Sequence, residues 1–188
     1  IREIRTSERR YYQKVTDIYS ECSVDYDKNS EVTLAFFKTV QNIMHYAVSG
    51  QTAAEIVYHR SDAERPHMGL TTWKNAPNGR VIKSDVTVAK NYLSEKEVEE
   101  LNLLTTQYLD YAELQAKNHV LMTMSDWKRA LNRFLEFNQL EVLIDKGTIS
   151  HQQAEEKAVA EYEKFRIIQD REIMSDFDQQ LKLLLNGR

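Results

Sequence analysis

The sequence has few of the residues that interrupt regular structure: five glycines and two prolines occur among 188 residues. Because glycine and proline mark most turns and breaks, their scarcity predicts long uninterrupted elements. The single cysteine, Cys22, excludes an intrachain disulfide and a multi-cysteine zinc site. It lies at a helical apolar position, where a packed thiol is expected rather than a nucleophile. No apolar run approaches the length of about 18 residues that a membrane span needs, so we expect a cytoplasmic protein without membrane contact.

The charge balance is mildly acidic, with a formal net charge of -4. This balance argues against a general binder of nucleic acid or anionic membranes, although a local basic patch remains compatible with it. The chain opens at Ile1, without a methionine, in the middle of a charged pattern with helical spacing. We therefore expect a fragment of a longer protein.

Apolar residues recur at helical spacing along most of the chain and predict an all-α fold, a bundle of about six or seven helices. Three capping boxes mark helix starts, namely Thr52 to Glu55, Ser94 to Glu97 and Ser150 to Gln153. The predicted helices cover residues 1–22, 30–50, 52–61, 84–93, 94–117, 125–146 and a long C-terminal stretch from 150 toward 185. We expect residues 1–149 to form a helical core and residues 150–188 a helix that packs on this core or on a partner chain.

Residues 62–84 form the irregular part of the sequence and contain both prolines. A connection of this length in a chain with few loops is more often functional than accidental, and a short extended piece is expected around residues 70–73. Trp73 has two interpretations: it anchors the loop to the core, or it offers a stacking platform for a base beside Lys74.

Candidate catalytic residues are few. Glu55 and His59 lie four residues apart on one predicted helix, and His45 near the end of the preceding helix is able to converge on them, as in a metal site. The alternative is that Glu55 closes its capping box, His45 lies at a helix end and His59 is exposed. Metal-binding spacings, a P-loop, G-x-S-x-G and G-x-G-x-x-G are all absent, so neither metal nor cofactor is expected. An enzyme acting on nucleic acid or a nucleotide, centred on His45, Glu55 and Arg60, stays an alternative.

Basic residues cluster in two segments, the first predicted helix and residues 59–90. Such clusters allow an acidic protein to present one basic face to phosphates, and the competing interpretation is a set of solvated faces and internal salt bridges. The predicted nucleic-acid contacts are Arg5, Arg9, Arg10, Lys14, Arg60, Lys74, Lys83 and Lys90.

Several sequence blocks together resemble the C-terminal part of the virulence-associated RhuM family. In order, they are RTSERRYYQKVTDIY, FFKTVQNIMHYAVSGQTAAEIV, MGLTTWK, SDVTVAKNYL, LDYAELQA, MSDW, FLEFNQLEVL and EYEKF. The resemblance extends to about Phe165 and leaves the remaining tail unmatched. It implies no catalytic residue, because none of these blocks is a catalytic motif.

The longer members of this family carry a preceding region similar to phage antirepressor-type DNA-binding domains, and their genes are found in pathogenicity islands and beside restriction-modification systems. The resemblance thus implies a helical accessory domain of a DNA-associated bacterial protein. We expect weak nucleic-acid binding through a basic face, or self-association through the C-terminal helix. A purely structural oligomerisation module is the remaining alternative.

Overall fold

The computed structural model describes residues 17–20, 23–27, 31–172, 181 and 184–185. No strand occurs in these ranges, so the predicted all-α class is confirmed. Residues 17–20 are helical, whereas Cys22 and the rest of the predicted first helix lie outside the described residues. The helices are α2 (Glu31–Ser49), α3 (Ala53–Arg60), α4 (Glu95–Lys117), α5 (Met124–Phe137) and α6 (His151–Glu172), with the 3-10 helices η1 (Pro66–Gly69) and η2 (Ala89–Tyr92).

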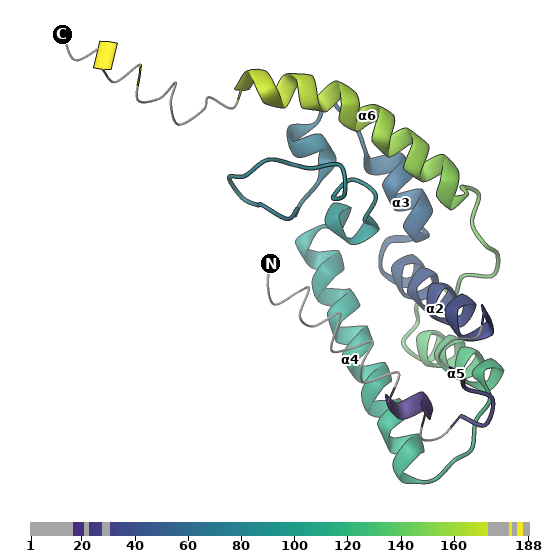
Figure 1. Cartoon of the computed structure of the whole chain (residues 1–188). Helices are drawn as coiled ribbons and strands as arrows, with labels where there is room; N and C mark the ends of the chain where they lie inside the picture. The colour runs from purple at the N-terminus through teal and green to yellow at the C-terminus, as the bar shows by residue number, and fades with distance from the viewer. Residues whose placement is uncertain (1–16, 21–22, 28–30, 173–180, 182–183, 186–188) are drawn as a thin grey trace.

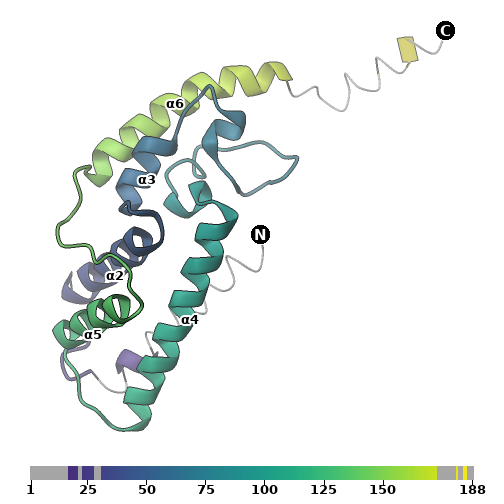
Figure 2. The same ribbon diagram turned by 180° about the vertical axis from the view of Figure 1, so that it is seen from behind.

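The helices pack around one hydrophobic core. α2 contacts α3, α4 and α5, while α6 lies across α3 and also touches η1 (Figures 1 and 2). The described part of the C-terminal helix therefore packs on its own chain. The largest fully buried side chains lie between residue 19 and the end of α5: Tyr19, Ile43, Ile56, Met68, Val81, Val86, Tyr92, Leu93, Tyr108, Trp127, Leu131 and Leu135.

Capping boxes start three helices where the sequence predicts them. In α3 and α4, the N-cap hydroxyls of Thr52 and Ser94 each accept a bond from the third residue's backbone N–H, and that residue's glutamate carboxylate accepts a bond from the N-cap backbone N–H. Ser150 exchanges the same pair of hydrogen bonds with Gln153 ahead of α6. A fourth box opens α5 from its N-cap Thr123, so that helix begins at Met124, one residue earlier than the predicted start at residue 125. The third residue of this box is an aspartate, whereas the usual capping-box pattern has Glu or Gln at that position.

Two predicted helices are shorter in the structure. The helix expected over 125–146 ends at Phe137, followed by Asn138 and by Gln139 with φ of 58°, a left-handed conformation that stops an α-helix. The helix expected over 84–93 is reduced to η2. There, the Asp85 carboxylate accepts hydrogen bonds from the backbone N–H groups of Lys74 and Ile82 and so stabilises a turn.

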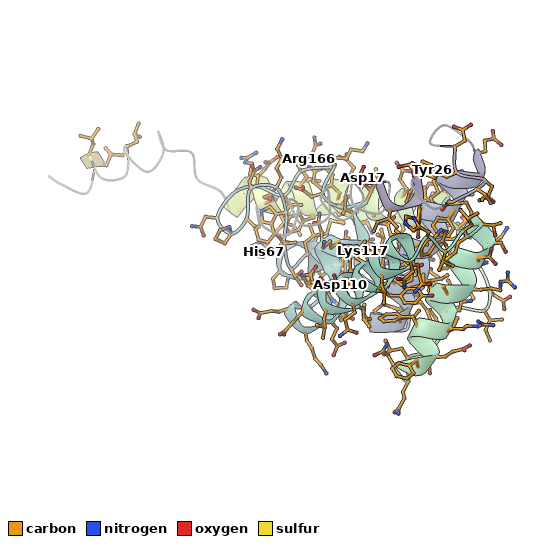
Figure 3. The ribbon with its side chains drawn as sticks, turned by 90° about the horizontal axis from the view of Figure 1, so that it is seen from below. Asp17, Tyr26, His67, Asp110, Lys117 and Arg166 are labelled. Carbon is orange, nitrogen blue, oxygen red and sulfur yellow. The ribbon has the colours of Figure 1, made fainter. Side chains whose placement is uncertain are left out.

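The long connection is ordered by side chains that fix its backbone. Trp73 is 4% exposed, and its indole N–H donates to the carbonyl of Gly79 at 2.7 Å. These contacts favour the anchoring interpretation, because a buried ring is not available to stack on a base. Gln169 of α6 exchanges two hydrogen bonds with the backbone of Val81. Figure 3 shows His67 of this connection and Tyr26 on opposite sides of the molecule.

The expected extended piece is not a strand: Thr71 and Thr72 both donate their backbone N–H groups to the single carbonyl of Asn91. Within the described ranges, no helix combines the length and the apolar character needed to span a bilayer.

The core of α5 gives a direct test of this packing. Leu131 is fully buried, so Leu131→Ala should lower the free energy of unfolding by about 2–5 kcal/mol. Leu103→Ala, a helical leucine that is 58% exposed, is the matched control and should change stability by less than about 0.5 kcal/mol. Urea unfolding followed by circular dichroism measures both, and equal effects of the two substitutions would contradict the described core.

Candidate functional site

Arg60 forms its hydrogen bonds with groups of the protein itself. Its guanidinium donates to both carboxylate oxygens of Glu97, at 2.7 and 2.8 Å, and also to the carbonyl of Tyr92 and the side chain of Gln51. The bonds from Arg60 hold the pKa of Glu97 at about 2; burial opposes them, and bonds from Ser94 add to them. This predicted catalytic and nucleic-acid residue therefore joins α3, η2 and α4.

Glu55 also forms its hydrogen bonds with groups of the protein itself. One carboxylate oxygen accepts bonds from the backbone and hydroxyl of Thr52, and the other accepts bonds from the backbone and hydroxyl of Thr148. Burial would raise the pKa of Glu55, but these hydrogen bonds lower it to about 2. A carboxylate with so low a pKa is a weak base at neutral pH, and its contacts tie the start of α3 to the segment before α6.

His45, another predicted catalytic residue, lines a cavity. It is 3% exposed, and its Nδ1 atom has no hydrogen-bond partner in the described part of the chain. Burial lowers the pKa of His45 to about 4, with the charge of Lys90 adding to this effect and that of Glu97 opposing it. The imidazole is thus neutral at pH 7 and has hydrogen-bonding capacity left over.

The structure describes some of the remaining predicted residues. Arg5, Arg9, Arg10 and Lys14 lie outside the described residues. Lys74 and Lys83 are exposed, whereas Lys90 is 8% exposed and faces a pocket. The sequence alone did not indicate this inward orientation of Lys90.

This pocket has a volume of about 430 Å³ and lies between α2, the start of α3, η2 and the start of α6. We call it the basic pocket. Its described lining includes one carboxylate, Glu155, which lies 4.0 Å from the imidazole of His151. The lining also contains several basic groups: Lys38, His45, Lys90, Lys146 and His151.

Two helix N-termini add to the positive potential of the basic pocket. The first residues of α3, with the cap Thr52, line one wall, and Ser150 and His151 at the start of α6 line another. The peptide dipoles of a helix place partial positive charge at its N-terminus, where anions are stabilised. The whole arrangement is suited to a compact anion such as phosphate.

Sequence reasoning missed Lys38, Lys146 and His151 as site residues. They lie on α2, on the connection after α5 and at the start of α6, and they line one cavity only in the folded chain. No local spacing rule connects them. The sequence signal that did exist was the Ser150 capping box, which places a helix N-terminus at this position.

Other features of the described chain are less suited to chemistry. A larger groove of about 840 Å³ between α4 and α5 is mainly apolar and includes Leu121 and Phe137, which are 72% and 85% exposed. In the described ranges, no three His, Cys, Asp or Glu side chains group closely enough to hold a metal ion. His59, a candidate ligand from the sequence, is exposed.

Comparison with known proteins identifies the chain's family. The model of the virulence protein RhuM family matches residues 1–174, which is most of the 188 residues. The chain belongs to the RhuM family. The match also extends past residue 165, where the sequence resemblance was expected to stop. No curated protein and no solved structure matches the chain.

The pair of Arg60 and Glu97 predicts a specific response to acid. Because the folded pKa of Glu97, about 2, lies below its ordinary value of 4.5, the stabilisation is complete above pH 4.5 and is lost as pH falls toward 2. Glu97→Gln should therefore be less stable than the parent by about 1–3 kcal/mol at pH 7, and the difference should shrink toward pH 3.

Urea unfolding at a series of pH values between 7 and 3 measures this difference. Glu99→Gln, an exposed position on the same helix, is the matched control and should show no such dependence. A Glu97→Gln deficit that stays constant down to pH 3 would contradict the role assigned to the ionised pair.

Proposed function

We propose that this RhuM-family chain binds nucleic acid and that it holds a phosphate group of that ligand in the basic pocket. The single observation that supports this function is the gathering of Lys38, Lys90 and Lys146 around one cavity with a single described carboxylate. Phosphate contacts from lysine and from helix N-termini supply most of the affinity in many nucleic-acid complexes. A net charge of -4 requires the contact to be local, as a pocket provides.

Lys74 and Lys83 support the same function from outside the pocket. Both are exposed on the long connection, and neither forms an ion pair with a described residue. Their charges are therefore free to meet phosphates along a strand. By contrast, the nearby Arg80 pairs with Asp170 of α6 at 2.8 Å.

Binding is favoured over turnover. Catalysis centred on His45, Glu55 and Arg60 would need these side chains to act on one substrate, but Glu55 and Arg60 are absent from the described lining of the basic pocket. Both are also held in internal hydrogen bonds. The described lining supplies positive charge and hydrogen-bond donors, which suit the binding of an anion.

Anisotropy of a labelled single-stranded oligonucleotide across a salt series tests the proposed function. Affinity should fall steeply with salt, and Lys38→Gln/Lys146→Gln should weaken binding and lower the slope of log K against log salt by about 1.4. Lys117→Gln/Lys128→Gln, the same charge change on exposed residues of α4 and α5, is the matched control. Equal losses for the two double variants, or no binding at low salt, would contradict the function.

Self-association is a second candidate function, favoured by the exposed apolar side chains near the C-terminal end. Leu184 and Leu185 are 75% and 69% exposed, and Ile167 on α6 is 54% exposed. Leu181 is also exposed, and Leu181, Leu184 and Leu185 have the i, i+3, i+4 spacing of one helix face. We propose that a second copy of the chain covers this end, because exposed leucines at this spacing are typical of helix pairing.

Light scattering of the full chain and of a chain ending at Glu172 tests this pairing. The cut preserves Gln169, whose two bonds to Val81 hold α6 on the core. The full chain should have twice the mass of a protomer and the shortened chain the mass of one. Ile144→Lys, on a 93% exposed residue, is the control and should leave the mass unchanged. Equal masses for the full and shortened chains would exclude the tail as the contact.

A further inference from the structure

The deepest basic groups of the pocket limit which phosphates are able to reach them. His45 and Lys90 are 3% and 8% exposed, yet both line the cavity. A phosphate within a continuous strand carries a sugar on each side, and a duplex is far wider than a cavity of about 430 Å³. A phosphate at the end of a chain has one substituent and enters such a cavity from one direction.

We propose that the basic pocket binds a terminal phosphate, that is, a phosphomonoester, with Lys90 and His45 at its inner end and Lys38 and Lys146 at its rim. This inference rests on the proposed function and names the part of the ligand that the pocket recognises. The ligand is a nucleic-acid end or a free nucleotide, which share this chemistry.

Charge favours a monoester over a diester. A phosphomonoester carries a charge of about -1.5 to -2 at pH 7 and three acceptor oxygens, whereas a backbone diester carries one negative charge. Three lysines and two helix N-termini converge on the basic pocket, against the single described carboxylate of Glu155. Compared with a diester, a monoester offers these lysines and helix N-termini a second negative charge and a third acceptor oxygen to bind.

The imidazole of His45 provides the independent observation. A buried polar atom without a partner costs about 1–3 kcal/mol, and most such atoms in native proteins are satisfied. The Nδ1 atom of His45 is such an atom in the described part of the chain. A phosphate oxygen at the inner end of the pocket would give the neutral imidazole the hydrogen-bond acceptor that the protein does not provide.

The size of the pocket is compatible with more than inorganic phosphate. Small-molecule sites typically occupy about 300–1,000 Å³, and the volume of about 430 Å³ lies within this range. Asn42 and Thr87 also line the cavity and offer neutral polar groups to a sugar or a base. A terminal nucleotide, rather than the phosphate alone, therefore suits the cavity.

The test compares internally labelled oligonucleotides of one sequence that carry a phosphate at the 5′ end, at the 3′ end or at neither end, with the full chain at fixed salt. One phosphorylated end should tighten binding about tenfold or more over the unphosphorylated strand. Lys146→Gln should remove most of that preference, because it should weaken binding of the phosphorylated strand more than binding of the unphosphorylated strand. Lys128→Gln, a single exposed lysine of α5, is the control and should keep the preference.

Lys90→Met and His45→Asn test the inner end, with thermal unfolding reporting whether each variant folds. Both residues are buried. If their substitutions prevent folding, Lys146→Gln at the exposed rim still decides the test. Competition by a nucleoside monophosphate and by inorganic phosphate then separates a nucleotide site from a site for phosphate alone.

The outcomes distinguish the two proposals. Equal affinity for all three oligonucleotides would overturn the terminal-phosphate inference and leave nucleic-acid binding intact. If no oligonucleotide binds but a mononucleotide binds in a Lys146-dependent way, the pocket assignment stands and the nucleic-acid function fails. No binding of any probe would overturn both.

Discussion

The ion pair between Arg60 and Glu97 is the contact on which the rest of the structure depends. It joins the last residue of α3 to the first turn of α4 and so closes the irregular stretch between them. Both oxygens of Glu97 accept from the guanidinium, and one also accepts from the backbone of Ser94 to complete the capping box. A bidentate arginine–carboxylate pair is directional as well as strong. This pair therefore fixes where α4 begins relative to α3.

The same constraint positions the inner end of the basic pocket. Arg60 donates to the carbonyl of Tyr92, the last residue of η2, while the Thr71 hydroxyl contacts the carbonyls of Asn91 and Leu93. Held at this end by side chains from two directions, η2 presents Lys90 inward instead of to solvent. Burial lowers the pKa of His45, and the nearby ammonium of Lys90 lowers it further, so the imidazole is neutral at pH 7. Residues outside the basic pocket thus decide which side chains line it.

Local rules predicted much of the fold and little of the site. The capping boxes are short-range hydrogen-bond patterns, so the starts of α3, α4 and α6 could be read from the sequence. The second oxygen of Glu55 binds Thr148, far along the chain, and no spacing rule gives that contact. Lys90 is the predicted nucleic-acid residue that the described structure places in the pocket. Its partners Lys38 and Lys146 could not be predicted, because tertiary packing alone brings them to the same cavity.

A cluster of like charges lowers the stability of the folded chain when no anion is bound. Lysines that share a cavity repel one another, and removing Lys90 from water adds to that cost. The fully bonded pairs around the pocket offset it, since Glu55 and Glu97 together hold α3, α4 and the segment before α6 in place. Sites are often less stable than the scaffold that holds them. A bound anion would relieve the repulsion at the pocket and stabilise the folded chain by mass action, so the affinity for such an anion and the stability of the fold would depend on the same few residues.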